Sequence, residues 1–247
     1  MVFKLFIFLL FFIKSSYAHE LRPAIANLNI YEKDNIINAT LSIQLNLEAI
    51  IAEINMNHSN TKESKESDQY ENLRTMSAVE LLKKFNSKIT TLQNKIYLTS
   101  SNTNYSLVLL NVDIPEVGNT DMIRDTIINF DIKDIKDEDL KFSWEKNLGS
   151  IILRVNSKDN KDLYSKLVES GEESDWFSIT NKREESLIDN IKSYIQLGFK
   201  HIIPKGLDHI LFVLALFLLS SRLKPLILQV SIFTLAHTIT LFLGVLD

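Results

Sequence analysis

The N-terminal half of the chain carries a regular alternation of apolar and polar residues around a short polar turn. The alternation runs up to Ile30, the polar stretch Glu32–Asn35 follows, and the alternation resumes from Ile37 to Leu47. A period of two places successive side chains on opposite faces of a strand. The pattern therefore predicts a β-hairpin with one buried face.

Four further short runs have the same strand-like character. They are Tyr105–Val112, Met122–Ile132, Leu140–Trp144 and Ile151–Val155, with a turn predicted over Asn147–Ser150. Short strands at such spacing are typical of a β-sandwich, so we expect a β-sandwich-like domain.

The segment between the hairpin and these strands starts with a polar stretch and continues with a helix signal. His58–Asn72 is rich in Lys, Glu, Ser and Asp without an apolar period, which predicts a loop. Ser77 and Glu80 have the spacing of a capping box, which predicts a helix that continues to about Phe85.

The first residues have the pattern of a secretory signal peptide. Met1–Lys4 is a short basic region, Leu5–Ile13 is apolar, and Ser16–Ala18 places small residues at a cleavage site. We expect residues 1–18 to be removed; the alternative is an uncleaved anchor, for which the apolar run is short. Cleavage would make His19 the N-terminus, and its amine and imidazole could chelate a metal; otherwise His19 is simply where the mature strand begins.

The last part of the chain is strongly apolar and predicts a pair of transmembrane helices over residues 207–221 and 225–246, after an interfacial segment 191–206. Arg222 and Lys224 between the helices indicate a cytoplasmic connector. Residues 19–190 would then be an exported β-rich domain. The expected fold class is mixed: an exported β-sandwich-like domain followed by an α-helical transmembrane hairpin, with the lipid bilayer as a partner.

Composition narrows the chemistry. The net charge is −4 and the chain has no basic face or Gly-rich phosphate loop, so we expect neither nucleic acid nor a nucleotide as a partner. No catalytic motif was found, so we do not expect an enzyme. Without cysteine, a metal site would use imidazole, carboxylate or backbone oxygen, which suits nickel, cobalt, zinc, iron or copper(II) and argues against copper(I).

The candidate metal ligands are ionisable residues in or beside the apolar segments: His201, Asp208, His209 and His237. His209 lies twelve residues before Ser221, and His237 lies twelve residues after Pro225. At 1.5 Å per residue both would lie about 18 Å from the connector. Two imidazoles and a carboxylate at one level suit a divalent metal or a proton relay. Alternatively, the histidines bond across helices and Asp208 caps one.

Four motifs of the chain occur together: His19–Pro23, Tyr194–His201, Gly206–Ala215 and Phe233–Leu241. Together they resemble the HupE/UreJ family of bacterial membrane proteins, in its branch with a large exported N-terminal domain. The family's motif of His, a spacer and Asp-His corresponds to His201, Asp208 and His209, although nickel-linked members have a spacer one residue shorter. The family has further helices, so we expect a C-terminally truncated member, a fragment.

The resemblance implies an inner-membrane protein with its N-terminal domain in the periplasm. Family members are associated with nickel uptake, which implies a divalent metal permease or part of one, with nickel, cobalt or zinc as substrate and no firm cofactor. A second hypothesis is a membrane-anchored periplasmic protein that binds or docks a protein partner without transport. A third is an intramembrane metal-dependent enzyme.

Overall fold

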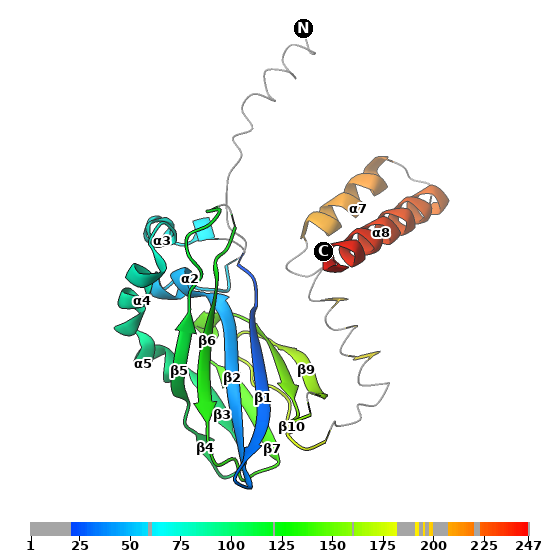
Figure 1. Ribbon diagram of the computed structural model, residues 1–247. Helices are drawn as coiled ribbons and strands as arrows, with labels where there is room; N and C mark the ends of the chain where they lie inside the picture. Colours follow the sequence, from blue (N-terminus) through cyan, green and yellow to red (C-terminus); the bar gives the residue numbers. More distant parts are fainter. Residues whose placement is uncertain are drawn as a thin grey trace. The chain divides into compact units, whose positions relative to one another are not determined.

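The computed structural model describes residues 21–58, 61–120, 122–159, 161–181, 191–192, 195, 198–199, 207–219 and 223–246 (Figure 1). The chain divides into two compact units, Met1–Arg183 and Glu184–Asp247. Each unit is described by itself.

The first unit begins with the predicted hairpin, which is confirmed. Strands β1 (Ala24–Lys33) and β2 (Ile36–Asn46) pair in antiparallel fashion, with Leu28 opposite Leu41. Between them Asp34 and Asn35 have φ angles of 55° and 62°. Two consecutive residues at positive φ give the turn a twist that matches that of the flanking strands, and Asp and Asn tolerate this conformation.

Among the described residues, six strands form one sheet in the order β5-β6-β2-β1-β8-β9 (Figure 1). The other members are β5 (Val108–Asp113), β6 (Asp125–Ile132), β8 (Ile151–Asn156) and β9 (Asp162–Val168). The β1–β8 pair is parallel, whereas the other neighbours run antiparallel.

Four described strands form a second sheet in the order β10-β7-β3-β4. Their bounds are β3 (Ile96–Thr99), β4 (Asn104–Tyr105), β7 (Asp139–Trp144) and β10 (Phe177–Ser178). Buried Leu98 and Phe142 of this sheet belong to the same hydrophobic cluster as Leu41, Phe130 and Leu153 of the larger one. One core therefore joins both sheets.

Short helices occupy the segment between β2 and β3. They are α2 (Leu47–Ile51), the 3₁₀ turn η1 (Thr61–Glu63), α3 (Ser67–Arg74), α4 (Ala78–Asn86) and α5 (Ile89–Gln93); a second 3₁₀ turn, η2 (Lys146–Leu148), follows β7. The capping box that opens α4 is confirmed. The loop predicted over His58–Asn72 is wrong in part, because α3 starts at Ser67 and buries Tyr70 and Leu73 against the core.

The second unit contains the described helices α7 (Leu207–Leu219) and α8 (Leu223–Leu246) (Figure 1). The expected fold class is wrong in its transmembrane hairpin: within the described residues, no helix is both long and apolar enough to cross a membrane. The 13 residues of α7 extend about 20 Å, whereas the hydrocarbon core measures about 30 Å. The longer α8 includes Lys224, Gln229 and His237.

Several predictions fall outside the description. Residues 1–18, His19 and His201 are not described, and only five positions of the interfacial segment 191–206 are.

Candidate metal site in the C-terminal helices

Three of the predicted ligands lie on described helices. Asp208 and His209 are the second and third residues of α7, and His237 lies in α8. The description covers the backbone of Asp208 and His209 but not their side chains. The His237 side chain is described and half-buried.

Aromatic contacts define how α7 and α8 meet. The rings of Phe212 on α7 and Phe233 on α8 have their centroids 4.5 Å apart, at an interplanar angle of 33°. On α8, the Phe233 ring is parallel to the His237 imidazole, with an interplanar angle of 1° and centroids 6.2 Å apart. The stack orients the imidazole relative to the face of α8 that contacts α7.

Helix geometry relates the two histidine positions to this contact. His209 precedes Phe212 by three residues and His237 follows Phe233 by four, and residues at these spacings share a helix face. The two helices run side by side in opposite directions (Figure 1). Positions 209 and 237 therefore lie on the same side of the aromatic contact, displaced along the axis by about 4.5 and 6 Å. Their backbones reach nearly the same level.

The threonines around His237 bond to their own helix. Thr234 Oγ1 donates to Val230 O at 2.9 Å and Thr238 Oγ1 to Thr234 O at 2.8 Å, while Thr240 Oγ1 donates to His237 O at 2.8 Å. All three hydroxyls therefore donate to backbone carbonyls of α8.

No three His, Cys, Asp or Glu side chains converge as a metal site within the described part of the chain. That part excludes the side chains of Asp208 and His209. The metal site of His201, Asp208, His209 and His237 therefore stays a prediction. The geometry that bears on it is the similar level of positions 209 and 237 along α7 and α8.

Sequence reasoning missed a buried ion pair in the first unit. Arg124 Nε donates to Glu48 Oε1 at 2.6 Å, and its Nη1 donates to Met76 O at 3.0 Å, between α3 and α4. Glu48 is 1% exposed, and its other oxygen, Oε2, has no hydrogen-bond partner among the described residues. Because 76 residues separate the two charges in sequence, no local spacing signals the pair. It connects α2 and the segment between α3 and α4 to the residue that precedes β6.

The family comparison concerns the second unit and the end of the first. Residues 178–247 match the family model described as HupE / UreJ protein, a range that includes His201, Asp208, His209 and His237. No curated protein matches the chain. The C-terminal segment of the chain, residues 178–247, is therefore similar to the HupE/UreJ family.

Proposed function

We propose that this chain binds a divalent transition metal through its C-terminal helices, as part of a HupE/UreJ permease for nickel, cobalt or zinc. The register of α7 and α8 carries the proposal, since the Phe212–Phe233 contact brings positions 209 and 237 to one level. The match of residues 178–247 to the HupE/UreJ model supports it.

The proposed ligands are Asp208, His209 and His237, with His201 as an entry ligand seven residues before Asp208. Two neutral imidazoles and one carboxylate form a nitrogen- and oxygen-rich donor set that suits nickel, cobalt and zinc. The Phe233 ring lies parallel to the His237 imidazole, with the ring centroids 6.2 Å apart, on the part of α8 that contacts α7.

The proposed location is the bacterial inner membrane, with residues 19–190 in the periplasm. Large apolar side chains on α7 and α8 are exposed, including Leu211 at 64%, Leu218 at 78% and Leu235 at 63%. Exposed apolar surface of this extent marks contact with lipid or with a protein partner. Signal cleavage after Ala18 would also free the amine of His19 as a second, separate chelate.

A second candidate function is a periplasmic binding or docking protein without transport. In this function the protein is anchored to the membrane, and the exposed apolar side chains of α7 and α8 favour it because such a surface also binds protein partners. Nickel accumulation separates the two functions: cells that express the chain should take up more nickel if it serves a permease, and no more than control cells if it only docks a partner.

Metal affinity tests the proposed site directly. Nickel binding to the purified protein should weaken by at least about tenfold in His209→Ala and in His237→Ala, because each substitution removes one ligand. His58→Ala is the matched control, since His58 lies in the first unit, and it should bind as the wild type does. Wild-type affinity in the His209→Ala/His237→Ala double variant, with unchanged helix content by circular dichroism, would refute the site.

A further inference from the structure

The segment that joins β5 to β6 contacts the turn between α3 and α4 through hydrogen bonds. Residues 115–120 and 122 of this segment, which we call the strap, are all exposed, including Val117 at 41% and Met122 at 68%. Because none of these side chains is buried, the hydrophobic effect does not hold the strap in place. Its attachment depends on polar contacts.

A buried arginine of α3 makes two of these contacts. Arg74, the last residue of α3, is 5% exposed. Its Nη2 donates to Met122 O at 2.6 Å and also to Thr120 O. The guanidinium carbon lies 5.4 Å from the centroid of the Tyr70 ring, within the range of a cation–π interaction. The guanidinium therefore lies between a buried aromatic ring and the backbone of the strap.

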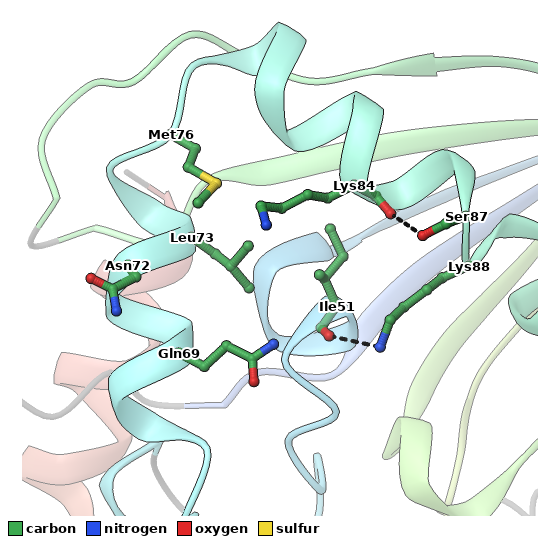
Figure 2. Close-up of a pocket in the computed structure, with 8 residues that line it drawn as sticks. All are labelled: Ile51, Gln69, Asn72, Leu73, Met76, Lys84, Ser87 and Lys88. Carbon is green, nitrogen blue, oxygen red and sulfur yellow. Dashed lines mark hydrogen bonds between the residues drawn. The ribbon is translucent and has the colours of Figure 1, made fainter.

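A second arginine makes the reciprocal contact. Arg124 Nη1 donates to Met76 O at 3.0 Å and to Pro115 O at 3.4 Å. Figure 2 shows Met76 beside the end of α3, in the turn that leads to α4. One guanidinium thus reaches from α3 to the strap, and the other reaches from the start of β6 to the α3–α4 turn. The two arginines fasten the same junction from opposite sides.

The two buried guanidiniums differ in how their charge is compensated. Arg124 forms an ion pair with Glu48, whereas Arg74 forms no ion pair with the residues that the structure describes, and its Nη1 has no hydrogen-bond partner among them. A buried charge without an opposite charge has lost hydration that its neighbours replace only in part. Release of the strap would return Arg74 to water, and it would expose no buried side chain of the strap itself.

We propose that the strap opens as a local conformational change, which exposes the Arg74 guanidinium while α3 and both sheets stay folded. Opening breaks the two hydrogen bonds from Arg74 to the strap, and water replaces them on a charge that was incompletely paired. The strap is then the part of the first unit that opens most easily, because the residues around it are held by buried apolar side chains such as Tyr70 and Leu73. The proposal concerns the first unit alone and does not depend on the proposed metal site.

Modification of arginine by phenylglyoxal, followed residue by residue by mass spectrometry of the full-length protein, tests the proposal. The rate at Arg74 is measured at urea concentrations below the unfolding transition and is normalised to the rate at exposed Arg154. A local opening exposes little new surface, so the normalised rate should change by less than about twofold over this range. Amide hydrogen exchange of Leu41, which is fully buried in a central strand, should accelerate steeply, because it requires global unfolding.

A double variant, Glu48→Gln/Arg124→Met, removes the second arginine without leaving a buried carboxylate unpaired. It should raise the modification rate of Arg74 by at least about tenfold, because the strap loses its charge-assisted bonds from Arg124, and leave the rate at Arg154 unchanged. If this variant does not fold, the urea series on the wild type decides alone. An Arg74 that does not react in the folded wild type, or whose rate follows urea as steeply as the exchange of Leu41, would overturn the proposal. An unchanged Arg74 rate in the folded double variant would overturn it as well.

Discussion

Gly149 is the residue at which backbone geometry constrains the sequence most. Its φ of 81° and ψ of −163° lie in a region that essentially only glycine adopts. A Cβ at this position would lie 2.8 Å from Met56 Cβ and 3.1 Å from Met56 O. The Gly149 carbonyl also accepts a hydrogen bond of 2.8 Å from Trp144 Nε1. Gly149 therefore accepts a hydrogen bond from the last residue of β7 and lets the backbone pass close to Met56, in the segment after α2.

We predict that Gly149→Ala lowers the free energy of unfolding by about 1–3 kcal/mol, since alanine would be strained in this conformation. Urea unfolding followed by Trp fluorescence measures the change. Gly118→Ala is the control, because a Cβ there would meet no atom within 4 Å. The interpretation fails if both variants unfold at the same urea concentration.

At the scale of single elements, α4 depends on its N-terminal capping box. Glu80 Oε2 accepts hydrogen bonds from the Ser77 hydroxyl at 2.7 Å and from the Ser77 backbone amide at 3.0 Å. These two bonds hold the pKa of Glu80 below its ordinary value of 4.5. The bond from the hydroxyl has the larger effect, and the bond from the backbone amide has the smaller one. A carboxyl with a lowered folded-state pKa stabilises the folded state above its unfolded pKa, and this contribution is lost as the pH falls through the folded pKa.

We therefore predict that Glu80→Gln is less stable than the wild type at pH 7, and that the difference shrinks as the pH falls below about 4.5. Unfolding free energies of both proteins between pH 7 and pH 3 measure it. A difference that does not change over this range would show that the ionised carboxylate is not responsible.

Elements that are specified by residues close together in the sequence were predictable. Elements that depend on residues far apart in the sequence were not. The β1–β2 hairpin and the α4 capping box follow from spacings of a few residues. Helix α3 was missed because Tyr70 and Leu73 supply its buried face within a segment of charged residues. The parallel pairing of β1 with β8 joins Ala24 to Ile151, and local periodicity contains no information about such a partner.

At the scale of the whole molecule, apolar composition predicted membrane-spanning helices, and residue spacing predicted the relative level of two histidines. Runs of apolar residues indicated a transmembrane hairpin, but the described helices lack the required combination of length and apolarity. Equal distances from the connector predicted that His209 and His237 share one level. The rotation of each helix could not be predicted; it depends on packing such as the Phe212–Phe233 contact, which a single sequence does not specify.

The central claim is that one metal ion bridges α7 and α8, and X-ray absorption spectroscopy at the nickel edge tests it most directly. In nickel-loaded full-length protein we predict scattering from two imidazoles, one from His209 and one from His237. The His237→Ala variant, loaded with nickel to measurable occupancy, should lose one imidazole and keep the other. A wild-type spectrum without imidazole scattering, or a His237→Ala spectrum identical to that of the wild type, would contradict the account.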